Sequence, residues 1–492
     1  MKKITISDLD GFTDICECEK MLGAVMKKLI SIFLIIYVNL FAIFAQDSLA
    51  IDKDCEELKK YMQEASIDCS IAIDEGLLDV DDVILKIKVE YDSVKNKDKR
   101  DKKNSKGIYS KIFAESISNV FSKELPYKNS HMLIYTKDFK YTPLKQFVFH
   151  SKIYFEKKGN EFYVEESDVR AIKKGMKYTG DNQNLLKAIH NGRELYRFGI
   201  FSESMQKKAK ISINDKSIKV PVKYVSSFVS NEEISYKITD KSIVVSITTC
   251  RPKDLEKFRK RVSEIRKEID STDKTVIIDL RNNTGGFVDN IHMILYSLLF
   301  EQNGENLEYY SKMINKQGSK IIELNTQIVR DRVSVDGDKE KVVRLRKFED
   351  KYLNWEKVIS EEDRNIEFIV KNPKYNKELY ILTNAATASA AEDFILFAKK
   401  IYNKVIIVGD NTWGCLTFSG PRSYLLPDSK VSLFLSPSDN RQKIAMICGK
   451  NWKGETYGVY PDYWATSEEI VDTIVYLSKD EELRKVILTG KQ

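Results

Sequence analysis

The chain has 492 residues, enough for two or three domains that each bury their own core. Hydrophobic residues make up 42% of the chain and charged residues 31%, which is typical of a soluble globular protein. The formal net charge of +7 is spread thinly, and no basic stripe with interleaved aromatic residues stands out. This distribution argues against nucleic acid as a partner.

Residues 26–45 have the pattern of an export signal. Met26 is followed by two lysines, an apolar stretch of 17 residues runs from Leu29 to Ala45, and Gln46 is polar. A positive start, an apolar middle and a small residue before a polar one are typical of a signal peptide. We therefore predict an exported protein, periplasmic or extracellular, cleaved after Ala45, with residues 1–25 as an upstream extension. A retained segment would instead form a short membrane anchor, so a membrane-anchored scaffold is an alternative.

Residues 46–145 are predicted to form an N-terminal helical region. Charged and apolar residues alternate at helical spacing over Val80–Val94, and the apolar residues of Ile108–Phe121 fall on one helical face. Pro126 ends this pattern. Cys55 and Cys69 lie close enough in the sequence for a disulfide in an oxidising compartment, but their spacing also fits one helical face.

Residues 146–225 have the character of a small β-rich domain. Short apolar stretches such as Phe147–His150, Ile153–Phe155 and Ala209–Ile213 read as strands, and the glycine of Lys158-Gly-Asn marks a turn. We expect this domain to bind or position other groups and to carry no chemistry.

Residues 226–492 alternate between strand and helix, which indicates an α/β sheet. Ser242–Ile247 and Thr275–Asp279 are predicted strands on either side of a charged amphipathic helix over Pro252–Glu268. A helix is expected over about 288–300. Residues 303–375 form a long, highly charged insertion within this domain.

A turn at Ser389 is the strongest candidate site. The apolar run Glu378–Leu382 stops, small residues follow, and a helical pattern begins at Phe394. A hydroxyl at such a turn lies beside unpaired N–H groups at the helix start, which favour developing negative charge. The alternative is that Ser389 only caps the helix, with Glu392 completing a capping box.

Two glycines that follow a strand could complete this site. Gly285 and Gly286 allow the backbone to approach a substrate closely, although the pair could also form a plain turn. If the two turns meet at one end of the sheet, the N–H groups of Gly286 and Ala390 would form an oxyanion hole. A serine nucleophile also requires a base.

Four motifs occur in order along the chain: Asp279-Leu-Arg-Asn-Asn-Thr-Gly-Gly286, Thr387-Ala-Ser-Ala-Ala-Glu392, Gly409-Asp-Asn-Thr-Trp-Gly414 and Gly458-Val-Tyr-Pro-Asp462. Together they resemble the tail-specific, or C-terminal-processing, serine peptidases. The resemblance implies a multidomain α+β protein with a ClpP/crotonase-like α/β catalytic domain, a PDZ-like domain in the β-rich region, and Ser389 as nucleophile. It also implies a peptide or unfolded protein as substrate. No CxxC motif or His/Cys cluster in the sequence suggests a metal, and we expect no cofactor.

The general base is where the branches of this family differ. The bacterial processing branch places a lysine just after the motif that here reads Thr412-Trp-Gly414, and this chain has Cys415 there. The tricorn-core-like branch takes a Ser-His pair from the helical region and a glutamate before Gly-Val-x-Pro-Asp, which correspond to Ser130-His131 and Glu455. This resemblance implies that His131 is the base, that Ser130 orients its far ring nitrogen, and that Glu455 holds Ser130 and stabilises the imidazolium.

Two other interpretations compete with this one. His131 could be an ordinary structural histidine, as we expect for His150, His190 and His292, and Cys415 is more consistent with a buried apolar residue than with a nucleophile. The chain would then be a non-catalytic protein that binds a peptide or small ligand on the same fold. The distance between His131 and Ser389 discriminates between these interpretations.

Overall fold

The computed structural model describes residues 49–97, 108–142, 145–225, 232–286, 378–401, 404–441 and 451–487, with the isolated positions 298, 316–317 and 444. The predicted signal segment, all of the charged insertion except 316–317, and all of the helix expected over 288–300 except position 298 lie outside the described residues.

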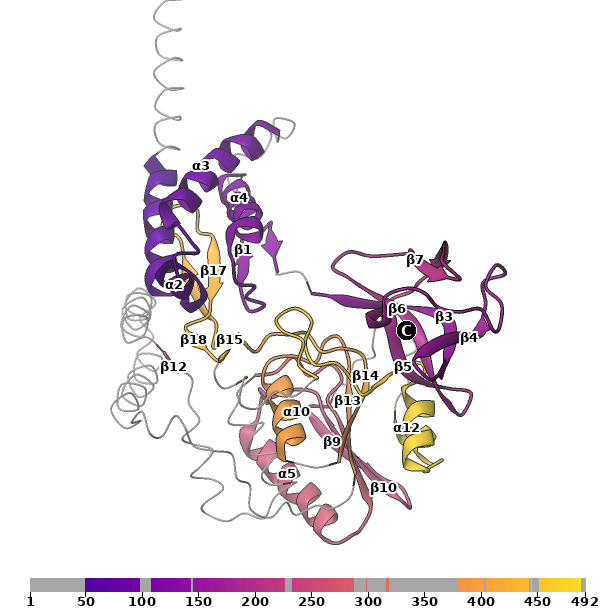
Figure 1. The fold of residues 1–492 in the computed structure, drawn as a ribbon. Coiled ribbons are helices and arrows are strands. Elements are labelled where there is room, and N and C mark those ends of the chain that lie inside the picture. The colour runs from indigo at the N-terminus through magenta and orange to yellow at the C-terminus, as the bar shows by residue number, and fades with distance from the viewer. Residues whose placement is uncertain are drawn as a thin grey trace, which may run out of the picture.

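A six-stranded sheet forms the centre of the described structure (Figure 1). Its strands are short and apolar, as expected for strands buried on both faces. All neighbouring pairs are parallel except the edge strand β9, which runs antiparallel to β10. The strand order is β19 (Tyr463–Trp464), β14 (Val405–Gly409), β13 (Leu379–Thr383), β11 (Thr275–Asp279), β10 (Ser242–Ile247) and β9 (Ile234–Ile238).

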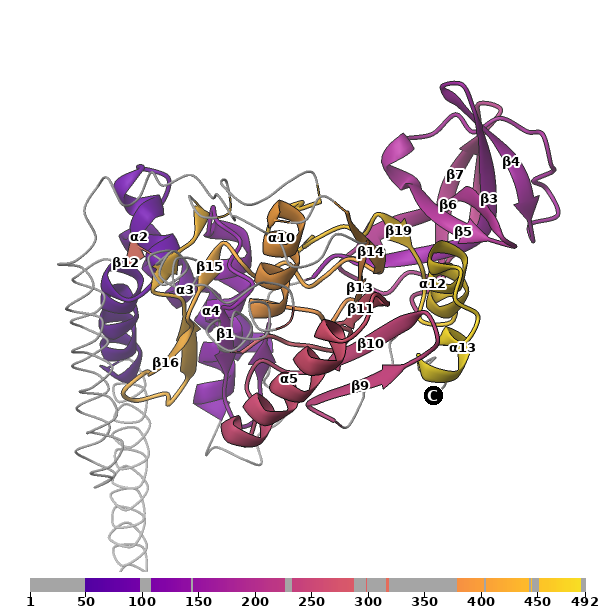
Figure 2. The ribbon, with the colours of Figure 1, turned by 90° about the horizontal axis from the view of Figure 1, so that it is seen from below.

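Helices cover both faces of this sheet (Figure 2). α5 (Leu255–Asp270) and α10 (Ala390–Ile401) share one core with Ile243 and Val245, whereas the intervening Val244 packs with α12 (Ile470–Ser478) on the other face. Successive strand residues point to opposite faces, so one β-branched strand supplies both cores. α13 (Leu483–Val486) closes the second layer. The predicted α/β sheet is therefore present.

The β-rich region has its own core and two sheets. The two strands expected at the start of this region are one strand, β3, which continues past an irregularity in its pairing between His150 and Tyr154. The assignment of this region as PDZ-like remains a prediction. One sheet has the order β4 (Glu161–Ser167), β3 (Phe147–Lys158), β6 (Arg193–Ser202) and β5 (Leu185–His190), with the 3-10 turn η2 (Asn182–Asn184) before β5, and the other sheet pairs β7 (Lys208–Ile213) with β8 (Lys216–Pro221).

The N-terminal region combines helices with strands from the far end of the chain. Residues 49–64 are helical, and α2 (Ile67–Asp74), α3 (Val80–Lys97) and α4 (Ile108–Glu124) follow. These helices pack in one core with a sheet in which a C-terminal hairpin pairs with an N-terminal one (Figure 1). That sheet has the order β16 (Arg422–Leu425), β17 (Ser432–Leu435), β1 (Leu133–Tyr135) and β2 (Lys140–Tyr141), and a separate small sheet has the order β12 (Lys316–Gln317), β18 (Ser438–Asp439) and β15 (Phe418–Ser419).

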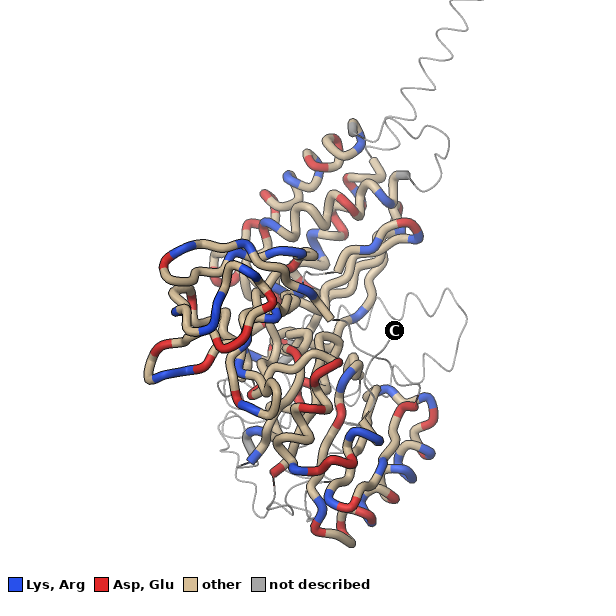
Figure 3. Tube along the Cα trace, turned by 90° about the vertical axis from the view of Figure 1, so that its right-hand side faces the viewer, with Lys and Arg blue, Asp and Glu red and all other residues tan. Residues whose placement is uncertain are grey.

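Cys55 and Cys69 are buried and free, so a disulfide between them is not formed and they serve as small core residues. Basic and acidic positions are interspersed along the described chain (Figure 3). Within the part of the chain that the structure describes, none of the helices is both long and apolar enough to span a bilayer.

Candidate active site

Ser389 lies at a strained turn between β13 and α10. Its φ of +55° falls in the left-handed region, which costs free energy in a residue other than glycine and is typical of functional turns. Two backbone hydrogen bonds hold the turn: Ala388 N–H donates to Asn283 O at 2.8 Å, and Trp413 N–H donates to Thr387 O at 2.7 Å. The surrounding loops therefore fix the direction in which the serine hydroxyl points.

The helix-capping interpretation of Ser389 accounts for only half of the contacts. Glu392 Oε2 accepts a hydrogen bond from Ser389 N–H at 2.8 Å, as in a capping box. The Ser389 hydroxyl, however, lies 3.2 Å from His131 Nε2. Glu392 is fully buried and also accepts from Gly414 N–H at 2.7 Å and Cys415 N–H at 3.0 Å. This carboxylate therefore joins the serine turn to the loop that follows β14.

His131 presents one ring nitrogen to Ser389 and the other to a backbone carbonyl. Its Nδ1 lies 2.6 Å from Phe418 O. Because a carbonyl can only accept, Nδ1 carries the proton and the Nε2 lone pair faces the Ser389 hydroxyl. Burial lowers the pKa of His131 to about 4, which keeps the ring neutral near pH 7. A neutral imidazole in this tautomer can take the proton of the serine.

The partner of the far ring nitrogen differs from the one implied by the family resemblance. Phe418 O occupies the place expected for Ser130. Glu455 Oε1 accepts hydrogen bonds from the backbone N–H groups of Leu416, at 3.0 Å, and Thr417. Glu455 therefore anchors the segment whose next carbonyl orients His131. A backbone carbonyl has no signature in the sequence, which is why sequence reasoning missed Phe418.

Ser130 and Glu455 lie together in the interior. Burial raises the pKa of Glu455 to about 7, and the nearby Ser130 hydroxyl lowers it without offsetting that effect. Within the described structure, Ser130 Oγ and Glu455 Oε2 are buried and neither makes a well-formed hydrogen bond. The structure thus brings both residues to the site, with Glu455 bound chiefly to backbone.

The glycine turn after β11 packs directly against the serine turn. A Cβ on Gly285, whose φ is +85°, would lie 2.7 Å from both Ala388 O and Ser389 Cβ. At Gly286, whose φ is +143°, a Cβ would lie 2.6 Å from the Cys250 carbonyl carbon. The two turns therefore meet at the carboxyl end of the parallel strands, which is the arrangement that an oxyanion hole built from the N–H groups of Gly286 and Ala390 requires.

Substituting Gly285→Ala is expected to displace Ser389 and to reduce the rate at which this serine reacts with a fluorophosphonate by on the order of 10²-fold. The added methyl group would overlap backbone that cannot move independently. Gly175→Ala is a matched control, because Gly175 has a φ of +86° but no described atom within 4 Å of the place that an added methyl group would take. Equal rate constants for the two variants would contradict the close approach of the turns.

Two buried groups behind the serine turn complete the site. The Cys415 thiol lies 3.5 Å from Glu392 Oε2, and burial raises its pKa, so it is a poor nucleophile. Lys145, which sequence reasoning missed, is also buried; its Nζ donates to Asn411 O at 3.2 Å and Thr412 O at 2.5 Å. Lys145 lies outside the four motifs, and only its position before the apolar strand Phe147–His150 could have indicated burial.

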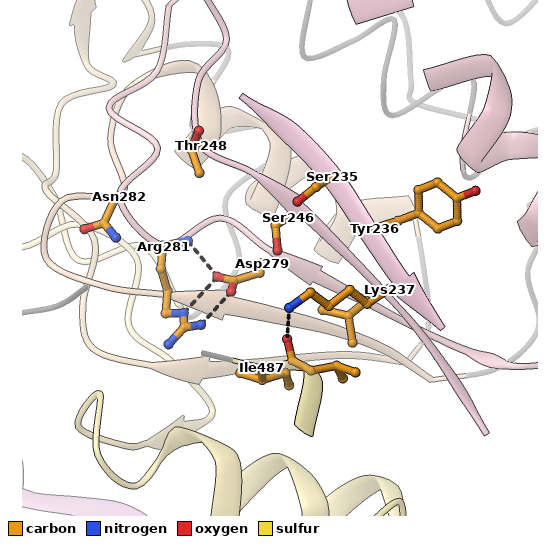
Figure 4. A pocket seen from close by; sticks show the side chains of 11 residues that line it. Ser235, Tyr236, Lys237, Ser246, Thr248, Asp279, Arg281, Asn282 and Ile487 are labelled. Carbon is orange, nitrogen blue, oxygen red and sulfur yellow. Dashed lines mark hydrogen bonds and ion pairs between the residues drawn. The ribbon is translucent and has the colours of Figure 1, made fainter. Parts of the chain in front are cut away.

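A separate pocket lies beside the Asp279–Arg281 pair (Figure 4). Arg281 donates to Asp279 through Nε at 2.9 Å and Nη2 at 2.6 Å, so the pair is already neutralised. Lys237, Ser235 and Ser246 also line the pocket, whereas Ser389 and His131 do not. Among the described residues, no group of three or more His, Cys, Asp or Glu side chains could hold a metal ion.

The remaining histidines that the structure describes lie in other contacts. His150 Nε2 is 2.8 Å from Asp410 Oδ1 in the interior, and the ring of His190 stacks on Tyr154 at 3.7 Å. Neither contact involves Ser389. His292 lies outside the described residues.

Comparison with known proteins identifies a family for part of the chain. Residues 241–462 match the family model described as Peptidase family S41. No curated protein matches the sequence. Three similar solved structures are mature CPAF complexed with lactacystin (16% identity, covering 89% of this chain and 98% of that one, TM-score 0.38), the photosystem II D1 C-terminal processing protease (10%, 88% and 96%, 0.33) and the tricorn protease (13%, 89% and 36%, 0.32).

The family match spans all four motifs, from Asp279 to Asp462. A serine hydroxyl with a base within reach is the arrangement that nucleophilic catalysis by a serine peptidase needs. Residues 241–462 therefore form a domain of peptidase family S41, the tail-specific peptidases, and the protein is a serine peptidase.

Proposed function

We propose that this peptidase cleaves peptide bonds through an acyl-enzyme on Ser389, with His131 as the general base. The observation that carries the proposal is the distance of 3.2 Å between His131 Nε2 and Ser389 Oγ. A base within hydrogen-bond reach of a nucleophile, and itself oriented through its other nitrogen, meets the geometric requirement for nucleophilic catalysis.

The reaction would proceed in two halves. Ser389 Oγ bonds to the peptide carbonyl carbon while its proton passes to His131 Nε2, and the N–H groups of Gly286 and Ala390 stabilise the negative oxygen. The imidazolium then gives that proton to the leaving amine as the C–N bond breaks. Water, activated by the same histidine, hydrolyses the ester and restores Ser389. Phe418 O holds Nδ1 throughout, and Glu455 keeps the segment before it in place.

The substrate is a peptide or an unfolded protein, and the site of action is outside the cytoplasm. The family supports a peptide or protein substrate. The sequence Met26–Ala45 supports export, with the enzyme released to a periplasmic or extracellular location after cleavage.

A non-catalytic binding protein on the same fold is the second candidate. The presence of Cys415 where the bacterial branch has its lysine base is the observation that favours it. The contact between His131 and Ser389 argues against it, because a binding protein has no need to keep a neutral imidazole on the serine hydroxyl.

Labelling with a fluorophosphonate probe tests the proposal. The probe reacts with activated serines, so we expect covalent label on the folded, mature protein, and peptide mass spectrometry should place the label on Ser389. Label at another residue, or no label on folded protein, would favour the binding protein.

A further inference from the structure

Lys145 is a buried cation that the proposed reaction does not use. It lies in the connection between β2 and β3 and is 2% exposed. Its two hydrogen-bond partners, Asn411 O and Thr412 O, are carbonyls of the loop that follows β14. A buried ammonium is costly unless hydrogen bonds and opposite charge compensate for its lost hydration. The position of this lysine therefore needs an explanation beyond packing.

Thr412 connects Lys145 to the serine turn. While its carbonyl accepts from Lys145, its hydroxyl donates to Glu392 Oε1. Glu392 in turn accepts from Ser389 N–H at 2.8 Å. The next residue makes a second connection, because Trp413 N–H donates to Thr387 O at 2.7 Å. The loop that Lys145 holds is thus bonded to the serine turn at two points.

The charges of Lys145 and Glu392 are complementary. Glu392 is fully buried, and the partners that bind its carboxylate, such as Gly414 N–H and the Thr412 hydroxyl, are neutral donors. The nearby Glu392 and Asp410 carboxylates favour the charged form of Lys145. Asp410 already has a partner in His150, at 2.8 Å. Lys145 is therefore the cation placed to balance Glu392.

We propose that Lys145 is a positioning residue of the active site: its ammonium holds the loop at Asn411–Thr412 and, through Thr412, stabilises the Glu392 carboxylate that fixes Ser389. This inference rests on the proposed function, because the residue that Lys145 helps to position is the proposed nucleophile, Ser389. Lys145 itself does not touch the reacting atoms. Without it, Glu392 would be an uncompensated buried charge and the serine turn would lose a fixed orientation.

The same arrangement predicts a pH dependence. Burial lowers the pKa of Lys145 to about 7, against the opposite influence of Glu392, Asp410 and Cys415, which face it from α10 and the loop after β14. Because the ammonium is the protonated form, it is lost as the pH rises through this value. The reactivity of Ser389 should therefore fall above about pH 7. The Glu455 carboxyl group also has a pKa of about 7, but it becomes charged as the pH rises. Its effect on the reactivity of Ser389 should therefore have the opposite sign.

The test is the second-order rate constant for fluorophosphonate labelling between pH 5 and 9 in wild type, Lys145→Met and Lys145→Arg. Near neutral pH, the rate constant of Lys145→Met is expected to be lower than that of wild type by on the order of 10–100-fold. Because methionine does not titrate, this rate constant should not fall further above pH 7. Lys145→Arg keeps a charge at every pH tested, so its rate constant should no longer fall above pH 7. Lys399→Met is the control, since Lys399, which lies on α10, also donates to a carbonyl, Val405 O, at 2.9 Å and pairs with Asp462 at 2.8 Å.

Each outcome has a defined meaning. An unchanged rate constant in folded Lys145→Met, or the same fall above pH 7 in wild type and Lys145→Arg, would overturn the role of Lys145 while leaving the proposed function intact. Absence of label in wild type would overturn the proposed function and this inference with it. A thermal melt of each variant shows whether it is folded, and if Lys145→Met does not fold, the pH profiles of wild type and Lys145→Arg decide.

Discussion

Substituting Ser389→Ala is expected to abolish fluorophosphonate labelling and to reduce peptide hydrolysis by on the order of 10³–10⁶-fold. The hydroxyl oxygen is the atom that would bond to the substrate, and the neighbouring Cys415 thiol cannot replace it, because this thiol is buried with a raised pKa. The measurement is label incorporation, together with hydrolysis of an unstructured protein substrate such as casein.

The fold should survive this substitution. Alanine keeps the Cβ of the turn, and the variant loses one hydrogen bond, to His131, which contributes about 1 kcal/mol. Ser151→Ala is a matched control, because Ser151 is also buried and donates to a carbonyl, Phe198 O, at 2.9 Å. Label retained in Ser389→Ala, or lost in Ser151→Ala, would contradict the assignment of the nucleophile.

Substituting His131→Ala is expected to slow labelling by on the order of 10²–10⁴-fold, the usual contribution of a general base. His131 Nε2 lies 3.2 Å from Ser389 Oγ and is the atom that accepts the serine proton in the proposed mechanism. The measurement is the rate constant of fluorophosphonate labelling in the folded variant and in wild type. His190→Ala is the control, since His190 is bound to Glu166 at 3.0 Å and stacks on Tyr154 away from Ser389.

The pH dependence gives a second test of His131. Burial lowers its pKa to about 4, and the neutral form is the base, so its contribution should be complete above that pH and lost below it. In wild type, the fall in labelling rate that is due to protonation of His131 should therefore occur near pH 4, well below the ordinary pKa of histidine. A loss centred near pH 6.5, the ordinary value, would show that the ring is not buried as the structure has it.

Local patterns in the sequence are sufficient to predict the strand and the turns that carry the site. The β-branched stretch Thr275–Asp279 forms the predicted strand, and the change from apolar to small residues before α10 places Ser389 at a turn. Such features depend on residues adjacent in the chain, whose hydrophobic period and backbone preferences are visible directly. The order of the motifs then indicated the family.

Contacts between distant segments were not visible in the same way. Residues 422–435 lie in the range predicted for the α/β domain, but the hairpin of β16 and β17 that they form shares a core with the N-terminal helices. That pairing brings the residues before β1 to the serine turn. His131 could be named from the sequence only through a resemblance to a family, since nothing local distinguishes it.

The sequence by itself determined the strands that lead into the glycine and serine turns, the two turns and the family. The tertiary structure alone decided which groups support the nucleophile: the Phe418 carbonyl on His131, the backbone bonds of Glu455, and the buried Lys145. The physical reason is that a carbonyl is common to every residue, and that burial, which shifts the pKa values of His131 and Lys145, is a property of the packed chain.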